Sequence, residues 1–352
     1  MTTVAVAVSG GADSLYALCA LKEQGHDVLA LHGRFLPPAD DHPDPTPDLR
    51  RVCAGLGIPL HVPDMTEAFD EAVIRPFVED YTAGHTPNPC ARCNARIKFG
   101  ALLDAATMLG ARRLATGHYA GLTRHPVYGL SLRRGADAAK DQSYFLALVP
   151  GERLKRALFP LADVTKKAAV AALEKRGLAV PLPTESQEIC FVPNDDYRTF
   201  LLSQSRARRI SLPGPGPMLL RDGRRVGRHQ GLWQYTEGQR RGLGVAWSEP
   251  LYVTGKSREN NVLLLGTRDE LGMRGCRTGA ANLLVAPELW PDRLLARVRY
   301  RQREMPAAVS VTNGCLHIRF EEPRTPSAPG QIAVVYDADG VVLAGGVIEE
   351  TE

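Results

Sequence analysis

The sequence predicts an α/β fold, a doubly wound parallel sheet, followed by two small β domains of which the last is a β-barrel. Three observations lead to this prediction. Short apolar strands alternate with helical segments over roughly the first 200 residues, the arrangement that builds a parallel sheet. From Gly214 onward, short strands are separated by turn-forming pairs such as Asp222-Gly223 and Asn313-Gly314. The length of 352 residues also exceeds that of one ordinary domain.

The change of pattern near residue 200 sets the expected domain boundaries. We expect an α/β domain over residues 1–204, a central β domain over 205–268 and a β-barrel over 269–352. Apolar residues make up 44% of the chain and charged residues 23%, as in a typical globular protein. No apolar run is long enough to cross a membrane, and the first residues form a strand rather than a leader peptide. We therefore expect a cytoplasmic protein with no membrane partner.

The strands of the first domain are short runs of apolar, often β-branched residues, as in strands that are buried on both faces. We expect them at Val4–Val8, Val28–Leu31, Ile58–Val62 and Arg113–Thr116. The helices between them have apolar residues at helical spacing. We expect them at Ser14–Glu23, Asp48–Leu56, Thr66–Tyr81, Asn94–Leu109 and Val164–Lys175. The third should break at Pro76, and the proline-rich segment Pro37–Pro47 should be a loop.

A glycine-rich turn joins the first strand to the first helix, with the sequence Ser9-Gly10-Gly11-Ala12-Asp13-Ser14. Glycines let backbone N–H groups face inward as an anion-binding nest, and the helix N-terminus adds partial positive charge. The hydroxyls of Ser9 and Ser14 can donate to phosphate oxygens. Asp13 could cap the helix or help to hold a magnesium ion. The turn lacks the Gly-Lys-Ser/Thr ending of the Walker loop.

Three of the seven cysteines are candidates for chemistry. An odd count in a reducing compartment argues against a disulfide framework. Cys90 and Cys93 precede an expected helix and have Arg92 and Arg96 nearby, so we expect depressed thiol pKa values. By spacing alone this pair could be a redox pair, half of a zinc site or part of an iron–sulfur site. With Cys190, three thiols could hold a 4Fe–4S cluster with one open iron.

The net charge of +4 permits a nucleic-acid partner without requiring one. Arginines cluster at three places in the second half of the chain, where they are either a solvated surface or an extended phosphate-binding face. The clusters are Arg206, Arg208 and Arg209, then Arg221, Arg224, Arg225 and Arg228, then Arg297, Arg299, Arg301 and Arg303.

Six motifs give the chain a resemblance to a known family. They are Ser9 to Ser14, Thr86-Pro87-Asn88-Pro89 through Cys93-Asn94 with Ile97-Lys98-Phe99, Ala115 to Tyr119, Lys140 to Tyr144, Glu185 to Phe191, and Tyr235 to Gly244. The first motif alone resembles the PP-loop of N-type ATP pyrophosphatases, which cleave ATP between the α and β phosphates and adenylate a carbonyl oxygen. Together the motifs span nearly the whole chain and resemble the tRNA-specific 2-thiouridylases (MnmA family).

The resemblance implies an enzyme that uses ATP and Mg²⁺ to make 2-thiouridine at the wobble position of tRNA. Its sulfur would come from a donor protein, such as a cysteine desulfurase or a sulfur carrier, or from sulfide. By matched position Cys93 would be the nucleophile and Cys190 the persulfide carrier, with Asp13 also catalytic. The nucleotide-binding positions would be Ala7, Val8, Ser9, Gly10, Gly11, Ala12, Asp13, Ser14, Gly33 and Gly117. The tRNA-contacting positions would be His118, Lys140, Asp141, Gln142, Arg299, Tyr300 and Gln331.

One departure from the family bears on mechanism, because many members carry Asp where this chain has Cys90. Sulfur could therefore travel as a Cys190 persulfide, or as sulfide on a cluster held by Cys90, Cys93 and Cys190. The nearest alternative is another PP-loop synthetase that adenylates a small-molecule carbonyl and needs no paired cysteines. A non-catalytic tRNA-binding module is the alternative from another class. The sulfur chemistry requires Cys93 and Cys190 to meet beside the glycine-rich turn.

Overall fold

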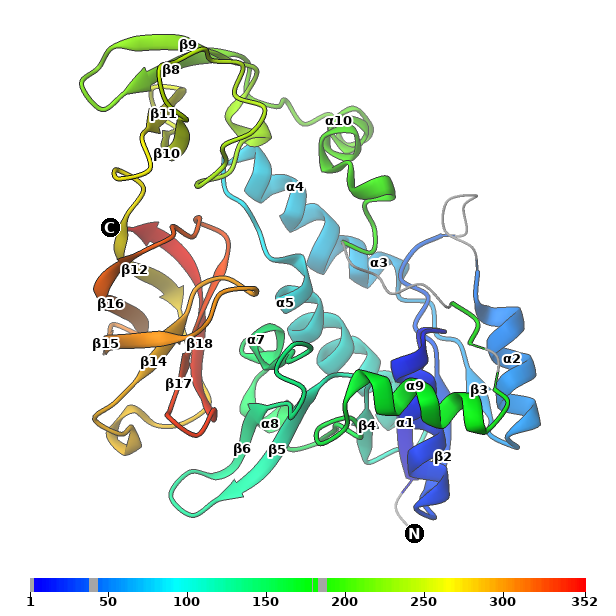
Figure 1. Ribbon diagram of the computed structural model, residues 1–352. Helices are drawn as coiled ribbons and strands as arrows, with labels where there is room; N and C mark the ends of the chain where they lie inside the picture. The colour runs from blue at the N-terminus through cyan, green and yellow to red at the C-terminus, as the bar shows by residue number, and fades with distance from the viewer. Residues whose placement is uncertain (1–2, 38–43, 179, 183–188) are drawn as a thin grey trace.

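The computed structural model describes residues 3–37, 44–178, 180–182 and 189–352. Figure 1 shows an α/β domain that carries the N-terminus, a small β domain containing β8 to β11, and a barrel containing β12 to β18. The predicted fold class is confirmed. Among the described helices, none combines the length and apolar character that a membrane span requires.

A parallel sheet forms the centre of the α/β domain, in the order β3-β2-β1-β4-β7. Its strands are β1 (Thr3–Ala7), β2 (Asp27–Leu31), β3 (Leu60–His61), β4 (Arg113–Ala115) and β7 (Ala157–Leu158). Neighbouring strands are parallel throughout. The strand order changes direction on the two sides of β1, and such a switch point is where doubly wound sheets bind ligands, at the carboxyl ends of the strands.

Helices cover both faces of this sheet (Figure 1). Val4 and Val6 of β1 pack in the cluster that includes α1 (Ala12–Glu23), α2 (Thr46–Gly55) and α9 (Lys166–Lys175). The intervening Ala5 packs in the other cluster, against the helical segment that carries Phe99 and Leu102. The alternation follows from the two-residue period of a strand.

The helices around the cysteines differ most from the sequence prediction. The predicted helix Thr66–Tyr81 is α3 (Thr66–Phe69), a wide π-helical turn over Asp70–Ile74 and then α4 (Arg75–Thr82). The wide turn comes just before Pro76, which lacks an N–H group and sits in the first turn of α4.

The next helix begins five residues earlier than predicted. It starts as α5 (Pro89–Cys93), continues through a wide turn over Asn94–Leu102 and ends as α6 (Leu103–Met108). The side chain of Asn88 caps it by accepting from Ala91 N at 3.1 Å, and proline occupies the first helical position. Cys90 and Cys93 therefore lie on the helix itself.

Several elements of the α/β part were absent from the sequence prediction. They are the hairpin of β5 (Ala120–His125) and β6 (Gly129–Arg134), the short helices α7 (Ser143–Leu146) and α8 (Gly151–Leu154), and α10 (Tyr197–Arg208). Helix α10 crosses the expected domain boundary at 204/205, which stays a prediction.

The two β domains have the turns that the sequence predicted. The central domain contains β8 (Gly216–Leu220), β9 (Arg225–His229), β10 (Tyr252–Ser257) and β11 (Val262–Gly266), in the order β10-β11-β8-β9. The barrel contains β12 (Met273–Ala280), β13 (Asn282–Leu283), β14 (Leu295–Arg297), β15 (Met305–Thr312), β16 (Cys315–Arg324), β17 (Ile332–Tyr336) and β18 (Val342–Thr351). Pairing between β12 and β18 closes it. The turn between β15 and β16 is Asn313-Gly314, both at positive φ, as predicted.

The barrel shares a hydrophobic core with the α/β domain. Ile332 and Tyr336 of β17 belong to the same buried cluster as Tyr144 and Leu146 of α7. The hydroxyl of Tyr144 donates to the carbonyl of Ile332 at 2.8 Å. The two parts are thus packed as one body.

Candidate functional site

The glycine-rich turn lies between the carboxyl end of β1 and the start of α1, as predicted. The Ser14 hydroxyl donates to Gly11 O at 2.9 Å and accepts from Ser9 N at 3.1 Å, which closes the turn. Gly10 has φ of +93°, and a Cβ there would lie 3.2 Å from Pro45 Cβ, so the position requires glycine. The turn therefore has the geometry of an anion-binding nest at a helix N-terminus.

Two further glycines lie at the same edge of the sheet. Gly33 follows β2 and Gly117 follows β4, each two residues beyond its strand. A Cβ on Gly117 would lie 2.8 Å from both Asp13 C and Ser14 N, so this residue packs directly on the start of α1. The structure thus brings both predicted nucleotide-binding glycines to the edge that holds the turn.

Asp13 is fixed by two partners from distant parts of the chain. Its Oδ1 atom accepts from the Tyr119 hydroxyl at 2.7 Å and from Lys166 Nζ at 2.8 Å. The amide oxygen of Gln142 accepts from Tyr119 N at 3.0 Å and so supports this arrangement. Lys166 was not among the predicted site residues. A cation in the first turn of a helix opposes the helix dipole, and this unfavourable placement is a signal that could have revealed it.

The structure places the three candidate cysteines in one neighbourhood, although the described residues form no cluster of metal ligands there. Cys93 is buried in an aromatic cluster with Phe77 and Phe191, and Phe191 directly follows Cys190. Cys190 and Cys90 each raise the pKa of the Cys93 thiol, and Cys90 raises that of Cys190, as neighbouring thiols do. Residues 185–188 of the motif that ends in Cys190 and Phe191 lie outside the described residues.

The expected depression of the thiol pKa values is wrong. Burial raises the pKa of Cys93 to about 12 and that of Cys190 to about 11, and it also raises the pKa of Cys90. Cys90 and Cys190 remain accessible to solvent on one side, but the surrounding protein still disfavours a charged thiolate. Arg92, which we expected to counter this effect, pairs with Asp80 at 3.3 Å.

Lys98 is the cation that acts on these thiols. It lowers the pKa of Cys90, Cys93 and Cys190 against the larger effect of burial. Its Nζ lies 3.5 Å from Nε2 of His118, whose Nδ1 lies 2.8 Å from the hydroxyl of Thr116. Burial and the Lys98 charge hold the pKa of His118 well below its usual range, so a neutral imidazole can accept from Lys98.

The barrel holds the segment that leads into the cysteine helix. Thr86 N donates to Pro329 O at 2.7 Å, and Asn88 N donates to Gly330 O at 3.1 Å. The side-chain amide of Gln331 donates to Thr86 O at 2.8 Å and to Pro87 O at 3.1 Å. Gln331, a predicted tRNA contact, thus has its amide group engaged with the protein.

The central domain holds the same segment from another side. Lys256 Nζ donates to Gly84 O at 2.7 Å, and the hydroxyls of Thr86 and Thr236 lie 3.2 Å apart. Lys256 also lies 3.7 Å from the carboxylate of Glu237. Burial lowers the pKa of Lys256 and raises that of Glu237, while each charge favours the other. Residues 84–88 are therefore held by hydrogen bonds from both β domains.

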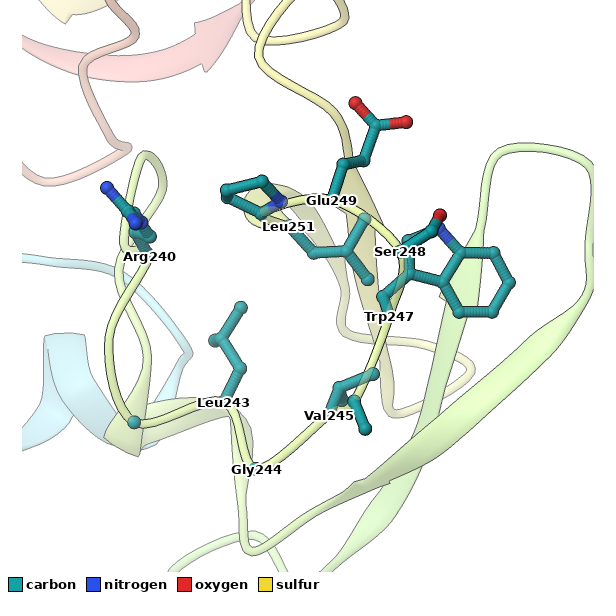
Figure 2. Close-up of a pocket in the computed structure, with 11 residues that line it drawn as sticks. Arg240, Leu243, Gly244, Val245, Trp247, Ser248, Glu249 and Leu251 are labelled. Carbon is teal, nitrogen blue, oxygen red and sulfur yellow. The ribbon is translucent and has the colours of Figure 1, made fainter.

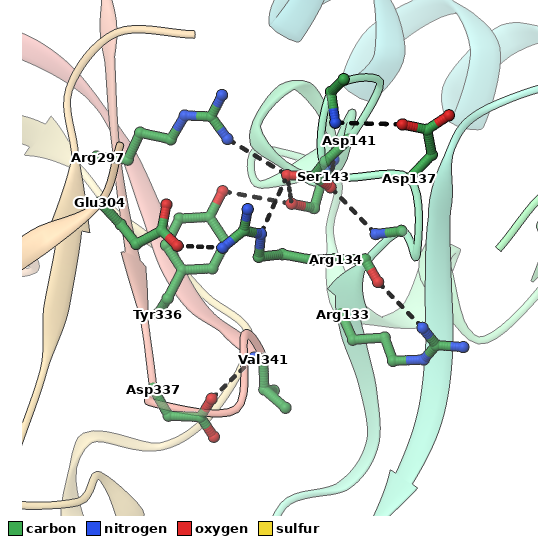
Figure 3. A network of polar contacts seen from close by, with 12 residues as sticks. Arg133, Arg134, Asp137, Asp141, Ser143, Arg297, Glu304, Tyr336, Asp337 and Val341 are labelled. Atoms are coloured by element: carbon green, nitrogen blue, oxygen red, sulfur yellow. Dashed lines mark hydrogen bonds and ion pairs between the residues drawn. The ribbon is translucent and has the colours of Figure 1, made fainter. Parts of the chain in front are cut away.

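Another predicted tRNA position, Asp141, lies inside the interface with the barrel (Figure 3). Asp141 is 2% exposed, and its side chain accepts from Gly135 N at 3.2 Å and Ser143 N at 3.1 Å. The guanidinium groups of Arg297 and Arg134 lie 3.3 and 3.5 Å from its Oδ2 atom. These contacts occupy the carboxylate with protein groups.

The remaining predicted tRNA positions differ in exposure. Arg299 is exposed, and Lys140 is half-buried. Tyr300 packs its ring 4.3 Å from that of Phe145. His118 is buried. Among these positions, Arg299 is therefore the most exposed to solvent.

Comparisons with known proteins cover nearly the whole chain. The family model described as tRNA methyl transferase HUP domain matches residues 2–194. The tRNA methyl transferase PRC-barrel domain matches residues 208–267, and the aminomethyltransferase beta-barrel domain matches residues 273–348.

Curated relatives match at high identity. A tRNA-specific 2-thiouridylase MnmA from Nitratidesulfovibrio vulgaris (strain DSM 19637 / Miyazaki F) is 59% identical over 349 residues, with 98% of each chain covered. Proteins of the same name from Oleidesulfovibrio alaskensis and Lawsonia intracellularis are 53% and 51% identical, again with 98% of each chain covered.

Proposed function

Because the chain belongs to the tRNA-specific 2-thiouridylase family, we propose that it catalyses ATP-dependent 2-thiolation of the wobble uridine in tRNA. The C2 carbonyl of uracil is a poor electrophile, and its oxygen is a poor leaving group. Transfer of AMP to that oxygen, with release of pyrophosphate, turns it into a good leaving group. A small-molecule PP-loop synthetase is not favoured, because the similarity extends through both β domains.

We assign ATP to the edge of the sheet that carries Ser9 to Ser14, Gly33 and Gly117. The inward N–H groups and the helix dipole would stabilise the charge of the departing pyrophosphate. Lys166 would hold Asp13 in place and add positive charge beside the phosphates. A nucleotide bound there lies at the end of β1 and β4, the usual ligand edge of such a sheet.

The thiols supply a balanced route for sulfur. The terminal sulfur of a Cys190 persulfide attacks C2 of the adenylated uridine, and AMP leaves with the C–O electron pair. The Cys93 thiolate then attacks the Cys190 sulfur of the resulting C2–S–S link. Thiouridine leaves with the S–S electron pair, and a Cys93–Cys190 disulfide forms. A dithiol reductant restores both thiols. In the other order, Cys93 attacks the persulfide first and releases sulfide, which adds to C2.

The described residues differ in how well they fit the two inorganic groups. Asp13 provides a carboxylate on the glycine-rich turn, and Mg²⁺ is usually bound by one or two carboxylates together with substrate phosphates. Mg²⁺ would neutralise phosphate charge there. Within the described residues, Cys90, Cys93 and Cys190 do not form a ligand group in this conformation. We therefore derive no step through a 4Fe–4S cluster.

The substrate and donor assignments remain proposals. Arg299 and Lys140 are the side chains we would place against tRNA, and a cysteine desulfurase, a sulfur carrier or free sulfide would supply the sulfur. A cytoplasmic location stays a prediction.

The observation that best supports this function is that Cys93 packs in one buried cluster with Phe191 and Ile189, the two neighbours of Cys190, although 97 residues separate the two cysteines in sequence. The test incubates the anaerobically purified protein with ATP, Mg²⁺, unmodified tRNA, a dithiol reductant and a cysteine desulfurase with cysteine, which delivers persulfide sulfur, and measures 2-thiouridine by mass spectrometry. Sulfide is left out, because it could add to the adenylated C2 without either thiol. Cys93→Ser and Cys190→Ser should each abolish the product, whereas Cys53→Ser, a buried cysteine on α2, should not. A Cys93→Ser variant with undiminished product formation would rule out this mechanism.

A further inference from the structure

The positive charge of the chain is concentrated in the central domain. Residues 209–268, which follow α10, contain ten lysines and arginines against four aspartates and glutamates, a net charge of +6, whereas the whole chain carries +4. The remaining residues together are therefore net negative. Such a concentration on one small domain is an electrostatic footprint for a polyanion.

One loop of this domain presents charged and aromatic groups around a hollow. The loop over residues 239–251 lines an open depression of about 710 Å³, with Arg240 at one side and Trp247 at the other (Figure 2). Trp247 is 38% exposed, and the guanidinium of Arg224 lies 4.9 Å from its ring centroid. Arg240 and Arg241 are exposed and form no ion pair among the described residues.

The residues just before this loop contact the segment that leads to the helix of Cys90 and Cys93. Thr236, four residues before Arg240, contacts Thr86 in the segment that leads to the cysteine helix. A Cβ on Gly238 would lie 3.7 Å from Pro326 of the barrel, so the start of the loop sits where the domains meet. A polyanion bound by Arg240 and Arg241 would therefore lie close to residues 84–88.

We propose that the loop over residues 239–251 binds the phosphate backbone of the substrate tRNA, with Arg240 and Arg241 each contacting a phosphate. This inference rests on the proposed function, because that function makes the polyanion a tRNA. The loop would fix the RNA beside the thiols, independently of Arg299 on the barrel.

The test measures the affinity of the full-length protein for unmodified tRNA, without ATP, from about 50 to 300 mM salt. Each phosphate contact contributes about 0.7–0.9 to the slope of log K against log salt. Arg240→Gln/Arg241→Gln should therefore lower the slope by about 1.4–1.8 and weaken binding about 15–30-fold near 0.15 M salt. The double substitution should weaken binding by the same factor for a tRNA that lacks the target uridine, because phosphate contacts carry no sequence information.

The matched control is Arg50→Gln/Arg51→Gln, an adjacent arginine pair on α2 with the same change in net charge. It should leave affinity and slope unchanged, and thermal melting should show that both variants are folded. Unchanged binding by the 240/241 variant, or an equal loss in the control, would overturn the inference. If wild-type protein binds tRNA as described but makes no thiouridine, the proposed function fails while the binding loop stands.

Discussion

Substitution of Gln331 tests whether this barrel residue contacts the RNA or instead positions residues 84–88, which lead into the helix that carries Cys93. Its amide donates two hydrogen bonds, to the carbonyls of Thr86 and Pro87, just before the helix that carries Cys93. Each such bond contributes about 1 kcal/mol net, so Gln331→Ala should weaken the hold on this segment by about 2 kcal/mol. Displacement of a reacting group by about 1 Å can cost about 100-fold in rate. We therefore expect kcat for thiolation to fall about 10- to 100-fold.

Gln331→Glu is the informative companion. A carboxylate has nearly the same shape but can only accept, and it would face two carbonyl oxygens. Its kcat should fall below that of Gln331→Ala. The affinity for tRNA, measured without ATP, should change less than about twofold in Gln331→Ala, because no RNA contact is lost.

The opposite pattern would refute this reasoning. If Gln331 contacts RNA directly, as the family resemblance implies, Gln331→Ala should weaken tRNA binding while kcat at saturating tRNA stays near the wild-type value. Thermal melting of both variants under assay conditions would confirm that the comparison is made on folded protein.

Three further predictions concern the thiols, the phosphate turn and the barrel contact. Burial raises the pKa of Cys93 to about 12, so the rate of its alkylation by iodoacetamide in ATP-free protein should keep rising above pH 9. Lys98→Met should slow this reaction further, because it removes the cation that favours the thiolate. A rate that levels off near pH 7 would contradict this prediction. Lys166→Met should raise the KM for ATP, measured by pyrophosphate release, about tenfold or more and leave the affinity for tRNA unchanged. An unchanged KM would show that Lys166 does not contribute to nucleotide binding. Gly330→Ala should reduce kcat more than Gly314→Ala. Both glycines have positive φ, but only the Cβ at position 330 would lie 3.0 Å from the Thr86 backbone. Equal reductions would mean that backbone strain alone causes the effect.

Local chemistry allowed the glycine-rich turn to be predicted from sequence. The glycine-rich turn needs only a strand, a helix start and residues that tolerate positive φ, and the local sequence from Val4 to Glu23 contains all three. The start of α5 was also written locally, because Asn88 followed by Pro89 is a strong capping signal, yet the prediction placed the helix start at Asn94.

Other features depend on contacts between distant segments. The pKa of Cys93 was predicted in the wrong direction because nearby arginines were visible in the sequence, whereas burial and the pairing of Arg92 with Asp80 were not. The contact of Lys166 with Asp13 spans 153 residues, and that of Gln331 with Thr86 spans 245. A local pattern can draw attention to one residue, as the helix start does for Lys166, but it does not identify the distant partner.

The shared core of barrel and α/β domain limits how the protein can be dissected. Truncation before β12 would strip the cover from Tyr144 and Leu146, both fully buried, and leave apolar surface that favours aggregation. Loss of activity in such a fragment would therefore report misfolding as readily as loss of RNA recognition. For this chain, point substitutions at surface arginines are more informative than domain deletions.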